Sequence, residues 1–217
     1  MQALIFDLDD TLYDLSRHRA HHLRRAWAEW LDHQEPVIAE ALVARAVRER
    51  IFFADMEGFL LRAGVEDAAL RAELIAESRA TWFTDLQFDD GVAALLSRLA
   101  GTYKLGLITN GPSWTQRAKI DQLQLAQWFP HIIVSGEYGY DKPDGRIFAA
   151  MLDRLGVAAS AAVMVGDNPD ADIRGAHGVG MRSIWIRHPH MTYPVDLAPA
   201  WRVVDHVTAL PGALYVP

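Results

Sequence analysis

Residues 3–11 read ALIFDLDDT, and this stretch decides the fold of the chain. Its first four residues form an uninterrupted apolar run, which is typical of a strand buried on both faces of a sheet. Acidic residues begin at Asp7, where that strand would end. Ligands of open α/β sheets bind outside the carboxyl ends of the strands. The acids at this end are therefore candidate functional residues.

Similar apolar runs recur further along the chain, with amphipathic helical patterns between them. Strands that alternate with helices predict an α/β fold with a doubly wound parallel sheet, covered by helices on both faces. The expected strands after the first are 104–109, 131–135, 162–165 and 183–186, and the expected helices of this region are about 91–100, 113–125, 145–155 and 170–177.

The region from about 15 to 87 has a different pattern. It contains long amphipathic stretches punctuated by Pro36 and Gly64, and no convincing strand. We expect an all-helical cap domain at 15–87, inserted into an α/β core made of residues 1–14 and 88–217 and placed above the carboxyl edge of the sheet. The helical patterns of the insert are 17–32, 36–63 and 67–83.

Composition excludes several classes of function. The 217 residues include no cysteine, which rules out a disulfide framework, a thiolate metal site and a cysteine nucleophile. The net charge of −7 offers no bulk attraction to nucleic acid polymers or anionic lipid. No basic segment precedes the first apolar run, and no uncharged apolar run approaches the roughly 18 residues of a membrane span. We expect a cytoplasmic protein without a membrane or nucleic-acid partner, and the sequence does not predict its oligomeric state.

Polar residues follow four of the expected strands, and parallel strands would bring them into one crevice. Like charges about 4 Å apart repel by roughly 4 kcal/mol at an effective dielectric near 20, so clustered carboxylates need positive charge. Oxygen ligands favour a hard cation such as Mg²⁺, and Lys142 would add a further charge. The four groups are Asp7 with Asp9, Thr109-Asn110-Gly111, Lys142-Pro143, and Asp167 with Asp172.

These residue types suit the hydrolysis of a phosphate monoester, one of the slowest uncatalysed reactions. Asp7 is placed to attack phosphorus and form an aspartyl-phosphate. Asp9, two residues later, could protonate the leaving oxygen and then activate water. Thr109 and Asn110 open a turn before a helix, where a hydroxyl and free backbone amides form an anion site. Gly111 would let the backbone approach closely.

The motifs DLDDT, TNG, KP and GDNPDAD resemble, in order, the four motifs of the haloacid dehalogenase superfamily. The resemblance covers the whole core, and the insert looks like the family's α-helical cap. The stretches around TNG and KP are similar to its small-metabolite phosphatases, which include phosphoglycolate phosphatases and nucleotidases. Family dehalogenases lack an acid two residues past the nucleophile, so Asp9 argues against dehalogenation.

The resemblance implies a role for each matching residue. Asp7 matches the nucleophile and Asp9 the general acid and base. The expected magnesium site consists of Asp7, the main-chain carbonyl of Asp9, Asp167 and Asp172. Further matches are Thr109 and Asn110 with the phosphate turn, Lys142 with the charge-balancing lysine, Asp167 with a magnesium ligand, and Asp172 with an acid that either binds the metal or orients its waters.

Several alternatives stay open at this point. A phosphomutase would share every motif, and a phosphoryl-accepting or binding module without turnover would share the chemistry. Phosphoglycolate, a nucleotide or a sugar phosphate could be the substrate. His18 and His22 are spaced to hold zinc, although a polar helix face is the simpler interpretation. Candidate substrate contacts are Tyr13, Arg17, His18, Trp114 and Arg117.

Overall fold

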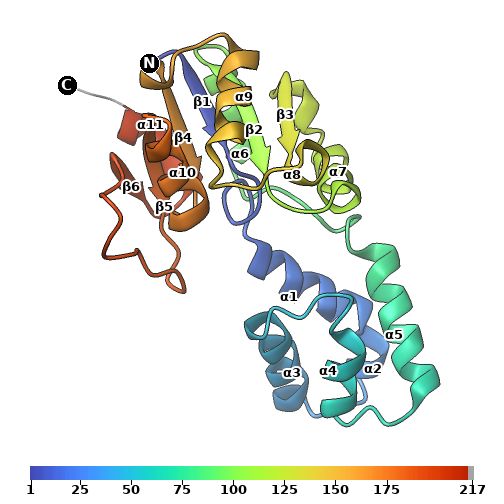
Figure 1. The fold of residues 1–217 in the computed structure, drawn as a ribbon. Helices are drawn as coiled ribbons and strands as arrows, with labels where there is room; N and C mark the ends of the chain where they lie inside the picture. Colours follow the sequence, from blue (N-terminus) through green and yellow to red (C-terminus); the bar gives the residue numbers. More distant parts are fainter. Residues whose placement is uncertain (215–217) are drawn as a thin grey trace. The chain divides into compact units, whose positions relative to one another are not determined.

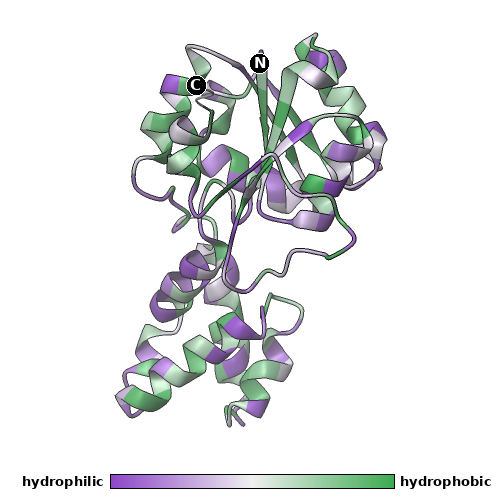
Figure 2. Cartoon of the chain, turned by 90° about the vertical axis from the view of Figure 1, so that its left-hand side faces the viewer, coloured by the Kyte–Doolittle hydropathy of each residue, from purple (hydrophilic) through white to green (hydrophobic). Residues whose placement is uncertain are grey.

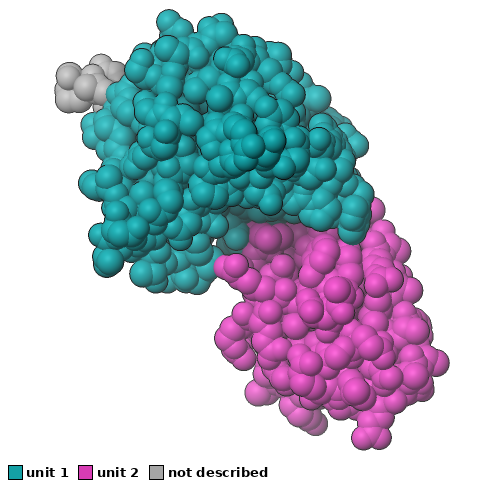
Figure 3. All heavy atoms as spheres, in the orientation of Figure 1, with its two compact units in different colours: residues 1–14, 88–217 teal, residues 15–87 magenta. Residues whose placement is uncertain are grey.

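A computed structural model of the chain describes residues 1–214. The chain divides into two compact units, Met1–Asp14 with Phe88–Pro217 and Leu15–Gln87, which Figure 3 shows in different colours. Each unit has a hydrophobic core of its own. We describe them separately.

The larger unit contains a six-stranded sheet in the order β3-β2-β1-β4-β5-β6. All five pairs of neighbouring strands are parallel, which confirms the predicted α/β class (Figure 1). The strands are β1 Ala3–Phe6, β2 Lys104–Thr109, β3 His131–Val134, β4 Ala162–Gly166, β5 Arg182–Ile186 and β6 Arg202–Val204.

The strand order reverses between β1 and β4. The chain runs outward from β1 through β2 to β3, and then crosses to β4 on the other side of β1. Phe6 at the end of β1 lies beside Val165 near the end of β4. Such a reversal opens a crevice at the carboxyl ends of the two strands, where doubly wound sheets bind their ligands. Asp7 and Asp167 directly follow these strand ends.

The strands β1, β2, β4 and β5 are largely buried because helices cover the sheet. Figure 2 shows the strands mainly in the hydrophobic colours, while the helices carry both kinds of residue. Ala3 and Ile5 on one side of β1 pack in the same cluster as Ile147 and Met151 of α9. The helices of this unit are α6 Val92–Ala100, α7 Ser113–Gln122, α8 Ser135–Tyr138, α9 Gly145–Leu155, α10 Arg174–Gly178 and α11 Leu210–Leu214, with short helical turns at Leu125–Gln127, Ala159–Ala161, Pro169–Ile173 and Val207–Ala209.

Some of the expected elements differ in extent or are new. The edge strand β6 was not predicted, because its three residues are exposed or half-buried and form no buried apolar run. The helix expected at 113–125 ends at Gln122, and that at 170–177 divides into a wide turn and α10.

The smaller unit is entirely helical within Leu15–Gln87. Trp27 lies at its centre, stacked on Phe59 and donating from Nε1 to Ser78 Oγ at 3.0 Å. The amphipathic helical pattern at 36–63 is interrupted in the structure. Helix α3 ends before Arg50, which has a left-handed φ of 52°, and the buried Ile51 begins a new segment. The helices are α1 Leu15–Ala26, α2 Ala28–Leu31, α3 Pro36–Arg48, α4 Met56–Arg62 and α5 Ala68–Thr81.

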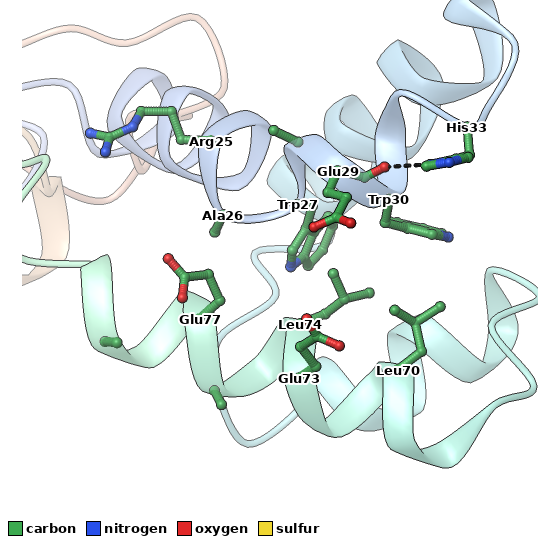
Figure 4. A pocket seen from close by; sticks show the side chains of 13 residues that line it. Arg25, Ala26, Trp27, Glu29, Trp30, His33, Leu70, Glu73, Leu74 and Glu77 are labelled. Carbon is green, nitrogen blue, oxygen red and sulfur yellow. Dashed lines mark hydrogen bonds between the residues drawn. The ribbon is translucent and has the colours of Figure 1, made fainter.

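A hollow of about 830 Å³ lies in this helical unit, between α1 and α2 on one side and α5 on the other (Figure 4). Trp27, Trp30 and Leu74 form part of its apolar lining, and Glu73 and Glu77 also line it. None of the predicted site residues lines it. None of the helices within residues 1–214 is long and apolar enough to cross a membrane.

Candidate active site

Three carboxylates gather at the reversal point of the sheet. Asp7 follows β1, Asp167 follows β4, and Asp172 comes from the wide turn after β4. Each offers an oxygen, and these oxygens all lie within 4.8 Å of one another. All three residues are buried. The crevice therefore unites acids that are separated by up to about three quarters of the chain.

Lys142 places its ammonium group among these acids. Its Nζ lies 2.5 Å from Asp7 Oδ1 and 2.7 Å from Asp172 Oδ1. The side chain of Asn110 anchors the backbone of this lysine, because Oδ1 accepts from Lys142 N at 2.8 Å and Nδ2 donates to Lys142 O at 3.0 Å. The turn after β2 thus fixes the segment that carries the lysine.

Asp172 is held by its own loop. Its Oδ2 accepts from the backbone N–H of Asn168 at 3.0 Å. Gly166 at the end of β4 makes room for this carboxyl, because a Cβ there would lie 2.2 Å from Oδ2. Asp170 in the same loop is exposed and pairs instead with Arg174 at 2.9 Å. The loop therefore turns one of its acids inward and another outward.

The cluster holds three acids and one lysine, so its negative charges outnumber its positive charge when all the acids are ionised. Burial, together with the charge of Asp172, raises the pKa of Asp7 to about 7 against the opposing effect of Lys142. Burial and the neighbouring Asp7 and Asp172 raise the pKa of Asp167 to about 9. The same acids raise the pKa of Lys142 above its ordinary value, although burial opposes them. A set of carboxylate oxygens with one lysine fits a hard divalent cation such as magnesium.

Asp9 lies outside this three-acid cluster and has its own partners. Lys119 Nζ contacts its two carboxylate oxygens at 2.7 and 2.8 Å, and Gln116 Nε2 donates to Oδ2 at 3.1 Å. The hydroxyl of Tyr13 also donates to the carboxylate. Burial raises the pKa of Asp9, but the charge of Lys119 and the hydrogen bonds outweigh this effect. The pKa of Asp9 is therefore below its ordinary value. These contacts favour the carboxylate form of Asp9, so Asp9 must take up a proton before it can act as the expected general acid.

Sequence reasoning missed Lys119 and Gln116. Both lie on α7, three residues apart, and both are buried. Residues three apart share a face of a helix, so a buried polar pair directly after the turn at 109–111 was the signal that could have revealed them. Tyr13 was considered as a substrate contact, and the structure instead directs its hydroxyl to Asp9.

The turn after β2 differs from the expected open anion site in one respect. The backbone N–H of Gly111 donates to Ser135 Oγ at 3.0 Å, so it is not a free donor here. The hydroxyl of Thr109 accepts from Gln116 Nε2. Gly136 lets the next segment approach, because a Cβ there would lie 2.7 Å from the carbonyl oxygen of Gly111.

The remaining candidates have partners away from the acids. Arg117 pairs with Glu137 at 2.6 Å on the surface, and Trp114 is largely exposed. His18 and His22 lie in the helical unit, where His22 Nδ1 is 3.3 Å from Asp85 Oδ2. Among the described residues, no third metal-binding side chain completes a site around the two histidines.

Comparison with known proteins decides the family. A family model described as haloacid dehalogenase-like hydrolase matches residues 1–180. The chain belongs to this family. The hydrolase is 24% identical to the putative HAD-hydrolase YfnB from Bacillus subtilis bound to magnesium, whose structure superposes with a TM-score of 0.72 over 99% of both chains. At this identity the likeness shows the fold alone.

Curated relatives of this hydrolase are phosphatases. It is 32% identical to a phosphoserine phosphatase of Thermus thermophilus, over 94% of this chain and 96% of that protein. It is 33% identical to a glyceraldehyde 3-phosphate phosphatase of Pyrococcus abyssi, over 87% of this chain and 82% of that protein. The predicted enzyme class, phosphatase, is confirmed by these relatives.

Proposed function

We propose that this hydrolase removes the phosphoryl group from a small phosphorylated metabolite, with Asp7 as nucleophile, Asp9 as general acid and base, and magnesium as cofactor. One observation carries the proposal. Asp7 lies within reach of Asp167 and Asp172, with carboxylate oxygens within 4.8 Å, and Lys142 contacts it at 2.5 Å. A carboxylate beside a cation site is the arrangement that covalent phosphoryl transfer requires.

The first step forms a bond between an Asp7 carboxylate oxygen and phosphorus. The bond between phosphorus and the leaving oxygen breaks, its electron pair goes to that oxygen, and the proton of the Asp9 carboxyl follows it. Asp9 becomes a carboxylate and the alcohol departs. In the second step Asp9 takes a proton from water, the water oxygen bonds to phosphorus, and the bond to Asp7 breaks. Inorganic phosphate leaves and both residues regain their starting states.

The remaining residues of the site hold charge in place. Lys142, anchored by Asn110, neutralises part of the negative charge on the transferring group and on Asp7. The hydroxyl of Thr109 and the turn that follows it would bind the phosphoryl oxygens. Asp7, the main-chain carbonyl of Asp9, Asp167 and Asp172 would hold the magnesium ion. The ion would supply further positive charge for the transferring oxygens.

We also propose a role for each unit. The catalytic core comprises residues 1–14 and 88–217, and the helical residues 15–87 act as its cap. The cap would exclude water during the transfer and select the substrate. Phosphoserine and glyceraldehyde 3-phosphate come first as substrate candidates because relatives act on them. Phosphoglycolate, nucleotides and sugar phosphates follow.

The test is phosphate release from 4-nitrophenyl phosphate, first with magnesium and then with a chelator. We expect turnover that depends on the metal and disappears in Asp7→Asn, because the amide cannot attack phosphorus. Asp153→Asn, an exposed acid on α9, is the matched control and should keep full activity. The phosphorylated metabolites above then define the substrate, and product analysis separates release to water from transfer to a sugar. Turnover in Asp7→Asn equal to that of the wild type would refute the proposal.

A further inference from the structure

The carboxylate of Asp9 rests against helix α7. Lys119 Nζ contacts its two oxygens at nearly equal distances, 2.7 and 2.8 Å. The lysine side chain is only 7% exposed, so its ammonium group is shielded from water. Gln116, one turn earlier, donates to Asp9 Oδ2 at 3.1 Å and also to Thr109 Oγ1. These two side chains connect the acid of the first strand end to the turn of the second.

The chain has few lysines, and their placement is selective. It contains three lysines against 18 arginines. Lys119 and Lys142 are buried, and each contacts an acid that follows β1. Lys104 is exposed and is the first residue of β2, at the end of the sheet away from the site. Burying an ammonium group is costly unless a charged partner compensates it. Both buried lysines therefore depend on the acids of the site.

We propose that Lys119 is a positioning residue that, with Gln116, holds the carboxyl group of Asp9 in the orientation needed to protonate the leaving oxygen. This inference rests on the proposed phosphatase function. Lys119 contacts both oxygens of Asp9, and Gln116 and Tyr13 each donate to one of them. A catalytic group that is already held in position reacts without the cost of first being oriented.

The proposal predicts a dependence on the leaving group. A phenol that is a strong acid departs as its anion and needs little help from Asp9. A weakly acidic phenol or an alcohol needs the proton, so its departure depends on how well Asp9 is positioned. Loss of Lys119 should therefore slow substrates with poor leaving groups far more than those with good ones. A purely structural role would slow both alike.

The experiment compares Lys119→Met with the wild type on 4-nitrophenyl phosphate and on phenyl phosphate, at saturating magnesium. We expect kcat on phenyl phosphate to fall at least about 10-fold more than kcat on 4-nitrophenyl phosphate, because general acid catalysis contributes about 10²- to 10⁴-fold. KM should change little, since the contacts of Lys119 are with Asp9. Lys119→Arg keeps the charge and should recover part of the loss.

Lys104→Met is the matched control, since it makes the same substitution at the far end of β2, and its ratio of the two rates should equal that of the wild type. An equal fall on both substrates, or no fall on either, would overturn the inference. If Lys119→Met does not fold, Lys119→Gln is measured in its place and must show the same selectivity. If the wild type turns over neither substrate, the proposed function fails and the inference falls with it. If turnover depends on Asp7 but the two rates fall together, the inference alone fails.

Discussion

Lys142 and Asp7 lie 135 positions apart in the chain, yet the ammonium group of one is 2.5 Å from the carboxylate of the other. The sheet makes this contact possible, because β1 and β3 end at the same edge of the sheet and the segment after β3 carries Lys142. Asp172 contacts the same ammonium group at 2.7 Å. A single lysine thus compensates two buried acids.

Replacing this lysine should disable the site. Lys142→Met leaves Asp7 and Asp172 without their cation, and we expect kcat to fall by about 10²-fold or more. Removal of one partner from a buried ion pair costs about 3 to 5 kcal/mol, so the free energy of unfolding should also fall. Steady-state kinetics and urea denaturation measure the two effects. Lys104→Met removes an exposed lysine that donates to Leu155 O at 2.7 Å, so it should leave kcat unchanged and lower the free energy of unfolding by only about 1 kcal/mol. Near-normal turnover in Lys142→Met would contradict this prediction.

Gly166→Ala should weaken metal binding. The added Cβ would lie 2.2 Å from Asp172 Oδ2, so the carboxyl must move away from its position. Displaced metal-site groups cost about 10- to 100-fold in affinity. The affinity is read from the rise of Tm with magnesium concentration, which does not depend on turnover. Gly178→Ala adds a methyl group into open space and should bind magnesium as the wild type does. Equal affinities in the two variants would show that the site tolerates the displacement.

His22 should make the protein less stable in mild acid. Burial is the main cause that lowers its pKa to about 4, although its Nδ1 lies 3.3 Å from Asp85, which Arg25 also contacts. Between pH 6.5 and 4 the unfolded chain takes up a proton that the folded chain does not, so the free energy of unfolding falls as the pH falls through this range. The expected loss is about 2 to 3 kcal/mol.

Urea denaturation of wild type and His22→Gln across this range isolates the histidine from the carboxylates. The difference between the two profiles should slope between pH 6.5 and 4 and be flat above pH 7. Arg25, His21 and Glu77 are the titratable groups whose charges act on His22. Parallel profiles would mean that His22 does not contribute.

Two aspartates that begin helices of the smaller unit should differ in their contribution to stability. Asp67 accepts from the backbone N–H groups of Ala69 and Leu70 at 2.8 and 3.4 Å at the start of α5. Asp55 begins α4 without a side-chain hydrogen bond to the helix. Loss of a cap costs about 1 kcal/mol, so Asp67→Ala should destabilise by about that amount and Asp55→Ala by much less. Chemical denaturation monitored by tryptophan fluorescence measures both. Equal losses would mean that the cap bonds contribute nothing.

The sequence predicted the class of fold and most of the strands because both rest on local patterns. A short apolar run such as residues 3–6 is typical of a strand buried inside a sheet, and the helical patterns between such runs favour parallel strands. The same reasoning brought Asp7 and Asp167 to one edge. The prediction was less accurate for 36–63. The helical period continues through this stretch and does not reveal that the helix stops before Ile51, whose side chain is buried.

The sequence by itself determined that these acids, the lysine of the third motif and the turn at Thr109 follow strand ends, because strand ends follow from the local run of apolar residues. Only the tertiary structure decided their partners. Lys119 contacts Asp9 across 110 positions, and Gly111 donates to Ser135 across 24. Such contacts depend on the strand order and on how α7 packs, which no local pattern contains. The edge strand β6 was decided in the same way, since its three residues form a strand only because β5 offers them a partner.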